Sequence, residues 1–324
     1  MALIVSTLVD YVNENSDLLI AKSLFSGRTA ELINAEGTVM VGVKFAEKIN
    51  ILATDATFQN GAGCIRVSSG STSITQRLLT VGDIAVVEDI CVKVLNSKYL
   101  SKALARGSNV NVLPFEQDFA DLKAMTIAKQ LEIAIWQGDT ASVNANLNRF
   151  DGLIKQIDAA TTAINSNLLV FTGLAPIATA TGIVAANVKA IVNSMWLALP
   201  ADVTGQDDIR IFCGWDTFNK YINSYTDQNL FNFAPTGSEV SAANGVVIIP
   251  GTNYKLTAVH GLDGTNRLFA MRMSNLFAGT DLENEYETFS IMEDQFKDFL
   301  RFKAVFKYGV NVAFPDEVVT FKLV

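Results

Sequence analysis

The sequence predicts an α+β fold, and three segments carry that prediction. A helical pattern covers residues 115–137, a strand-like segment covers 38–80, and alternating apolar residues run through the closing segment 271–324. The 324 residues are 49% hydrophobic and 18% charged, as in ordinary folded domains, which excludes a disordered or collagen-like chain. A chain of this mass can bury about three quarters of its unfolded surface, enough for one large core or two smaller ones.

Residues 1–37 are expected to form an N-terminal arm. Short helical turns are predicted around residues 3–12 and 18–25, and they are too short to hold a core alone. No basic residue precedes the first apolar run, and Asp10 interrupts that run, so a secretory signal is not expected.

Residues 38–80 are predicted to form a long β-hairpin. Alternate residues from Val39 to Phe45 are large and apolar, which is typical of a half-buried strand. A glycine-rich turn at 60–63 separates this run from a later one at 73–79. The residues alone leave two alternatives open: an edge hairpin packed on its own domain, or an arm that projects from it.

The strongest helix prediction is residues 115–137. Pro114 stands at its start, acidic residues occupy its first turn, and Gly138 follows as a C-cap. Apolar residues recur every three and four positions, and the helix would be about 36 Å long. It is therefore expected to cross a whole domain.

The middle of the chain mixes helix and strand signals. An alanine-rich helix is expected at 183–199 and buried strands at 209–214 and 246–251. Polar residues interrupt the helix pattern, so a membrane span is not expected. Residues 235–245 are the best candidate for a mobile loop.

The closing segment predicts a β-hairpin or meander. Even-numbered residues from Leu300 to Phe314 are mostly apolar, whereas basic residues occupy odd positions. Acidic residues alternate in the preceding segment 281–287. A turn at 292–295 would make opposite charges face each other, each pair contributing up to about 1 kcal/mol. The expected pairs are Glu287 with Arg301, Glu285 with Lys303, and Asp281 with Lys307.

Signals for catalysis are weak. His260 is the single histidine, and no GxSxG motif or phosphate-binding loop is present. Three scattered cysteines lack metal-ligand spacing and, being odd in number, favour a reducing compartment. We therefore predict no catalytic, cofactor-binding or metal residues and no cofactor. The alternative of another class is a soluble α/β enzyme that uses His260.

The net charge of −8 gives no bulk attraction to phosphate, so tight nucleic-acid binding is not expected. A surface of this charge can lie beside DNA without gripping it.

The order of these elements resembles the major capsid protein family of tailed bacteriophages, with its Hong Kong 97-like fold. The local matches are FEQDFADLKAMTIAKQLEIAIWQGD followed by FDGLI, and the ending FSIMEDQFKDFLRFKAVFKYGVNVAFPDEVVTF. The resemblance implies a structural protein, not an enzyme, that self-assembles into the pentamers and hexamers of an icosahedral head enclosing double-stranded DNA. It also implies location in the virion after assembly in the host cytoplasm.

By this resemblance, residues 38–80 are the extended loop that lies over a neighbouring subunit. Residues 81–151, with spine helix 115–137, and the return strands 271–324 form the peripheral domain, and 152–270 form the axial domain. The candidates for contacts between subunits in the loop are Lys44, Lys48, Asn60, Gly61, Gly63 and Arg66.

The implied partners are further copies of the chain, portal and scaffolding proteins, and decoration proteins as an option. DNA would be enclosed without sequence-specific binding, and no membrane is involved. The hairpin follows within 40 residues of Met1, so a separate scaffolding protein, or none, is expected. The nearest alternative is an encapsulin-type shell around a protein cargo, and a tail or adaptor protein fits less well.

Overall fold

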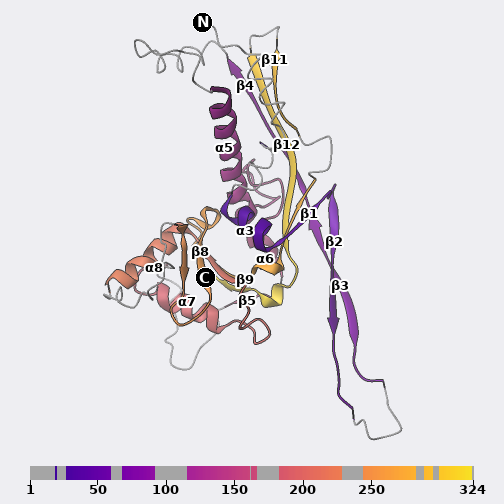
Figure 1. Ribbon diagram of the computed structural model, residues 1–324, viewed down its shortest axis with the longest axis vertical. Coiled ribbons are helices and arrows are strands. Elements are labelled where there is room, and N and C mark those ends of the chain that lie inside the picture. The colour runs from indigo at the N-terminus through magenta and orange to yellow at the C-terminus, as the bar shows by residue number, and fades with distance from the viewer. Residues whose placement is uncertain are drawn as a thin grey trace.

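The computed structural model describes residues 19, 27–59, 68–91, 115–160, 162–165, 182–227, 244–281, 288–294 and 299–322. It comprises a tall five-stranded sheet with a long helix beside it, a compact six-stranded sheet to one side, and a projecting hairpin (Figure 1).

Strand β12 (Phe299–Val312) is the centre of the five-stranded sheet. It pairs antiparallel with β4 (Gly82–Cys91) along one edge, and with β11 (Thr288–Asp294) and β10 (Leu276–Thr280) along the other. Strand β1 (Thr38–Val41) adds in parallel to β10. As predicted, the even-numbered residues of β12 are buried and most of the odd-numbered ones in its first half are exposed or half-buried.

Helix α5 (Phe115–Gln137) covers the buried face of this sheet and has the bounds predicted from the sequence. Helices α3 (Arg28–Glu36) and α6 (Leu153–Ala159) pack beside it. Trp136, near the end of α5, lies 5.2 Å from the ring of Phe212 and 5.6 Å from that of Phe269, both in the six-stranded sheet. This tryptophan joins the two sheets through one apolar core.

The six-stranded sheet lies beside helices α7 (Val188–Leu197) and α8 (Trp215–Asp227), which pack on its own core. The strand order is β5 (Ile164–Asn165), β13 (Val319–Phe321), β9 (Leu268–Arg272), β6 (Ile209–Cys213), β8 (Lys255–Ala258) and β7 (Val246–Ile248). Strand β13 is part of the six-stranded sheet, because Val319–Phe321 pairs with β5 and β9 of that sheet. The sequence predicts instead that this strand lies with the other return strands of 271–324. Short 3-10 turns are η6 (His260–Leu262), η7 (Met273–Asn275) and η8 (Pro315–Glu317).

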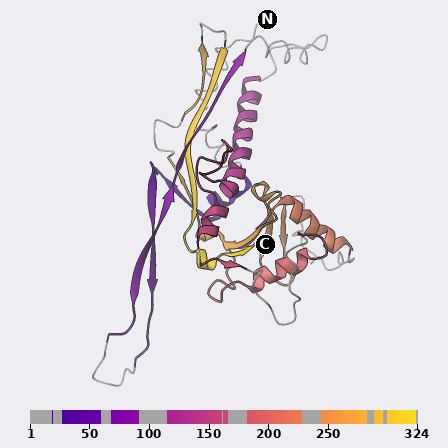
Figure 2. The same cartoon turned by 180° about the vertical axis from the view of Figure 1, so that it is seen from behind.

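Strands β2 (Ala46–Thr54) and β3 (Thr72–Thr80) form a separate antiparallel ribbon. Both views show it leaving the body and pointing away from α5 (Figures 1 and 2). The projecting arm is thus the correct one of the two alternatives. The strand expected at 39–45 ends at Val41 and belongs to the five-stranded sheet, because Gly42 turns the chain with a positive φ of 79°.

Candidate functional site

The hairpin exposes an apolar face. Its outer face, defined here as Lys48, Asn50, Leu52, Ile74, Gln76 and Leu78, consists of directly opposed residues of β2 and β3. Leu52 lies opposite Ile74, and these side chains are 61% and 68% exposed, while Leu78 is 53% exposed. The opposite face packs on the body only at its base, where Ile49 and Leu79 are buried against Ala313.

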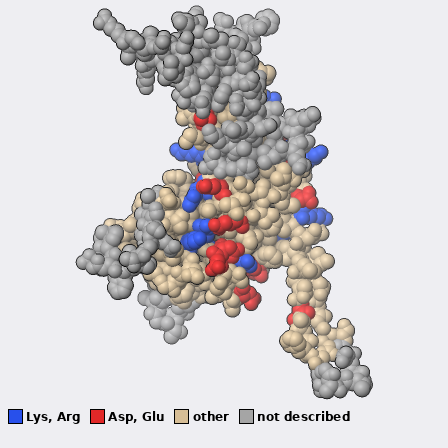
Figure 3. Space-filling model, in the orientation of Figure 1, with Lys and Arg blue, Asp and Glu red and all other residues tan. Residues whose placement is uncertain are grey.

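Beyond the end of β2, Phe58 is also fully exposed. Figure 3 shows that Lys, Arg, Asp and Glu gather over the middle of the molecule, whereas the hairpin is mostly uncharged. On the outer face the hydrogen-bonded pair Asn50 and Gln76 separates Leu78 from Leu52 and Ile74. Exposed apolar side chains on a projecting ribbon favour a site of interaction with another molecule.

Polar contacts fix the base of the hairpin to β12. The Asn311 Nδ2 group donates to the Leu78 carbonyl at 2.7 Å, and Arg77 Nη2 donates to Asn311 Oδ1 at 3.3 Å. Burial lowers the pKa of Arg77. Lys307 Nζ donates to the Lys44 carbonyl at 2.8 Å. The hairpin therefore leaves the body in a defined direction.

Lys44 and Lys48, two of the predicted contact residues, are exposed at the base of the hairpin. The other four loop candidates, and two of the acidic ones, lie outside the described residues: Asn60, Gly61, Gly63, Arg66, Glu285 and Glu287.

The predicted charge ladder is correct at one position. Asp281 and Lys307 form an ion pair, with Oδ2 and Nζ 3.1 Å apart, and the Asp281 side chain is buried. Arg301 instead lies opposite Met292 on β11 and binds Asp89 of β4 through two hydrogen bonds of 2.7 and 2.9 Å.

The predicted register for Arg301 and Lys303 is therefore wrong, because Lys303 faces Ser290 on β11 and Val87 on β4. Two strands, β10 and β11, share the same edge of β12. Their ladders on β12 differ in register by an odd number of residues, which puts the second ladder on the other parity.

No protein-family model and no curated protein sequence matches the chain. A chain of the satellite phage P4 procapsid, a structure that includes the size determination (Sid) protein, matches with a TM-score of 0.61 at 10% identity, over 100% of this chain and 91% of that chain. The capsid of the empty GTA particle matches with a TM-score of 0.52 at 11% identity, over 90% and 89% of the two chains. Mycobacterium phage Bobi gives 0.52 at 10% identity, over 91% and 90%.

The chain has the fold of phage capsid proteins. At about one residue in ten identical, the likeness is in the fold, and the chemistry of individual residues must come from this chain's own geometry.

His260 lies on the surface of this capsid fold. Its Nδ1 is 2.8 Å from Asp263 Oδ2, its ring stacks on Trp215, and its side chain is 63% exposed. The other oxygen of Asp263 accepts the Trp215 backbone N–H at 2.7 Å, which satisfies the start of α8. The contacts described for this histidine are thus structural. The buried thiol of Cys213 has its pKa raised by desolvation, which leaves it neutral.

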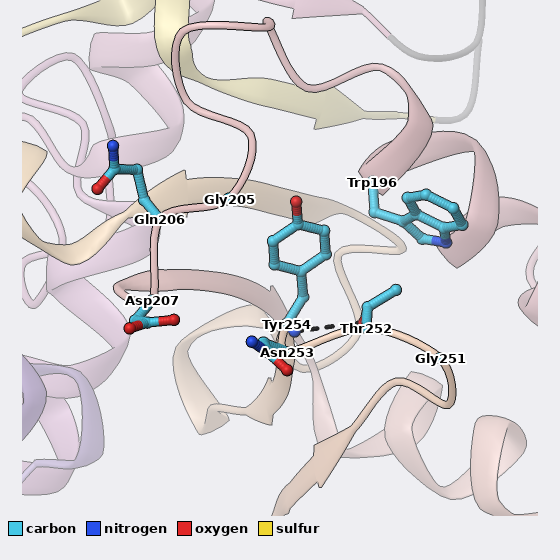
Figure 4. Close-up of a pocket in the computed structure, with 8 residues that line it drawn as sticks. All are labelled: Trp196, Gly205, Gln206, Asp207, Gly251, Thr252, Asn253 and Tyr254. Atoms are coloured by element: carbon cyan, nitrogen blue, oxygen red, sulfur yellow. Dashed lines mark hydrogen bonds between the residues drawn. The ribbon is translucent and has the colours of Figure 1, made fainter.

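One pocket of about 250 Å³ lies at an end of the six-stranded sheet of the capsid fold. Trp196, Tyr254 and the loop from Gly205 to Asp207 line it (Figure 4). Asp207 is the one carboxylate in its lining.

Across the described ranges, no helix is long and apolar enough to cross a membrane. In the same part of the chain, no group of three or more His, Cys, Asp or Glu residues is arranged to hold a metal ion.

The sequence did not identify the apolar residues of the outer face. Ile74 and Leu78 fall on one parity of a strand-like run, which was the available signal. Parity alone does not say which face lies against the body and which faces solvent. Asn311, which binds the hairpin base, gave no signal, because its partners are more than 230 residues away.

Proposed function

We propose that this chain is a phage major capsid protein of the Hong Kong 97-like fold. Copies would assemble into the pentamers and hexamers of an icosahedral head that encloses double-stranded DNA. In that reading, α5 and most of the five-stranded sheet make up the peripheral domain, and the six-stranded sheet makes up most of the axial domain.

The observation that carries the proposal is the outer face of the hairpin. Leu52, Ile74 and Leu78 are each more than half exposed on a ribbon that contacts its own body only at the base. A two-stranded ribbon is marginally stable in water by itself, and its open edges invite pairing with other chains. A neighbouring copy that covers the ribbon removes both problems.

Shell assembly also needs no catalytic group. Many weak contacts of this kind, repeated around a closed shell, give a stable particle by multivalency. Lys44, Lys48 and the predicted loop residues Asn60, Gly61, Gly63 and Arg66 are proposed contact residues in this interface.

The proposed partners are other copies of the chain, with portal, scaffolding and decoration proteins, and the proposed site of assembly is the host cytoplasm. The negative net charge suits a wall that encloses DNA without sequence-specific binding.

The test is negative-stain electron microscopy and size-exclusion chromatography of the purified chain, alone and with candidate scaffolding protein. The wild type should form shells, pentamers or hexamers. The double variant Leu52→Asn/Ile74→Asn should unfold in urea like the wild type but stay unassembled. Thr75→Asn, an exposed change on the opposite face of the same strand, is the matched control and should assemble.

A wild-type chain that stays monomeric or dimeric under all these conditions would contradict the proposal, as would normal shells from the double variant. The nucleic acid or protein content of purified particles then separates a phage head from a cargo compartment.

A further inference from the structure

Helix α3 has no cap of its own. It has nine residues, and Gly27 occupies the N-cap position without a side-chain hydrogen bond. A helix this short is marginal in water, and its first N–H groups need acceptors from elsewhere.

Those acceptors come from Glu132, in the second-last turn of α5. Glu132 Oε2 accepts the Thr29 N–H at 2.9 Å, and Oε1 accepts the Thr29 hydroxyl at 2.5 Å. Trp136 Nε1 donates to the same hydroxyl oxygen at 2.7 Å. Glu132 is 4% exposed, and a Cβ on Gly27 would lie 2.7 Å from Oε2, so a larger residue at position 27 would displace this carboxylate. One helix thus supplies the cap of another.

The far end of α3 is held by a second acidic contact. Glu36 accepts hydrogen bonds from the buried Arg210 of β6, one of them from Nε at 2.9 Å and the other from Nη2. The helix is therefore attached to α5 at its start and to the six-stranded sheet at its end.

The chain runs from α3 directly into β1 and the hairpin. Strand β1 has four residues at the edge of its sheet and pairs with β10 alone among the described strands. The Val43 N–H then bonds to the Thr280 carbonyl at 3.1 Å, three residues before β2. These are few hydrogen bonds for a segment that sets the position of one hairpin strand. The other attachment of the segment is apolar, because Ala30, Leu32 and Ile33 of α3 are buried in the main core.

We propose that residues 28–43 form a strap that detaches as a unit from the body, and that the hydrogen bonds of Glu132 to Thr29 hold the start of this strap in place. Loss of the cap unwinds the first turn of α3, loosens β1 from the sheet edge, and frees the base of β2 to change direction. The strap follows from contacts within one chain. The use of that freedom, to adjust the hairpin to a neighbouring copy, rests on the proposed function.

The test is hydrogen–deuterium exchange by mass spectrometry on the unassembled full-length chain. Glu132→Ala should raise exchange in residues 28–43 about tenfold, the size expected for loss of a cap, while residues 255–258 of β8 stay unchanged. Glu132→Gln keeps an acceptor oxygen and should have a smaller effect. Lys129→Ala, on the exposed side of the same helix, is the matched control and should have none.

Unchanged protection of residues 28–43 in Glu132→Ala would overturn the proposal. So would a rise of equal size across β8 and β12, because Glu132 would then stabilise the whole fold instead of the strap. If Glu132→Ala does not fold, Thr29→Val removes the hydroxyl contact and should give the same local pattern. None of these results depends on whether the chain assembles, so a failed assembly test would leave them interpretable.

Discussion

Gly279 and Gly309 face each other across β10 and β12, directly beneath the chain that leaves the hairpin. A Cβ on Gly309 would collide with the backbone carbonyl of Thr80, whereas a Cβ on Gly279 would lie 3.0 Å from the side chains of Leu79 and Val81. Backbone therefore crosses backbone at this point, and the two glycines make the crossing possible.

Gly309→Ala should cost more stability than Gly279→Ala. The first change pushes against main chain that cannot move aside, so the free energy of unfolding should fall by about 3 kcal/mol. The second meets only side chains, which can shift, and should cost about 1 kcal/mol. Urea unfolding of the two variants checks the order, and equal losses would contradict the crossing described here.

Lys307→Met should destabilise the fold strongly, because Asp281 is buried and Lys307 lies 3.1 Å from its carboxylate. Removing the cation leaves a buried charge, which costs about 3 kcal/mol. The double variant Lys307→Met/Asp281→Asn should recover much of that loss. Lys303→Met, an exposed lysine on the same strand, should change the unfolding free energy by less than about 0.5 kcal/mol. Equal effects of the two single variants in urea would contradict this.

Asn311→Ala should loosen the hairpin at its base. The change leaves the Leu78 carbonyl and the Arg77 guanidinium without the amide that binds both. Both groups are partly solvent-accessible, so the loss is that of two hydrogen bonds, about 1 kcal/mol each. Limited proteolysis should cut the variant faster than the wild type near residues 77–81. Cleavage there at the wild-type rate would show that the hydrogen bonds of Asn311 do not hold the base of the hairpin.

Glu132 should make stability depend on pH. Burial raises the pKa of Glu132 above its ordinary value of 4.5, against the lowering effect of the hydrogen bonds from Thr29. The folded chain therefore keeps a proton that the unfolded chain has lost. The stability gained from protonated Glu132 is fully present below pH 4.5 and is lost as the pH rises through the raised pKa of Glu132. The free energy of unfolding should therefore fall over that pH range.

Glu132→Gln should remove this slope, as measured by urea unfolding at several pH values. Glu36 and Asp158 act in the opposite sense, because their arginine partners lower the pKa of each carboxyl and their contribution is lost toward acid. Both proteins contain Glu36 and Asp158, so subtracting one curve of unfolding free energy against pH from the other leaves the effect of Glu132 alone. Parallel profiles would show that Glu132 does not titrate differently in the fold.

The sequence predicts those elements whose signals are local. Helix α5 has the predicted bounds because Pro114 and Gly138 mark them in the sequence. The predicted apolar stripe is only partly correct, because Leu122 and Met125, which belong to it, are 66% and 63% exposed. The parity of β12 is equally clear, because every even position faces one core. The Asp281–Lys307 contact follows from the β10–β12 ladder, which has the predicted register.

The β11–β12 register depends on a non-local event. Thr280 faces Tyr308 and Thr288 faces Val305, so the chain advances eight residues on one side and three on the other. The two ladders therefore differ in register by five residues, and an odd number exchanges the two faces of the strand. The available signal is short: Phe289 and Ile291 flank Ser290, which places the odd positions of β11 against the buried even positions of β12. The candidate site also could not be predicted from local sequence. The exposure of Leu52 and Ile74 depends on where the hairpin lies relative to the body.

The position of β13 has a consequence for synthesis on the ribosome. Val319–Phe321 lies between β5 and β9, so the sheet stays split until residues 319–321 have been translated. A nascent chain that has already made β6, β8 and β9 still exposes the edge of β9. A chain truncated before residue 319 therefore leaves this edge of β9 unpaired and β5 detached from the sheet, so the six-stranded sheet is completed only once β13 has been made.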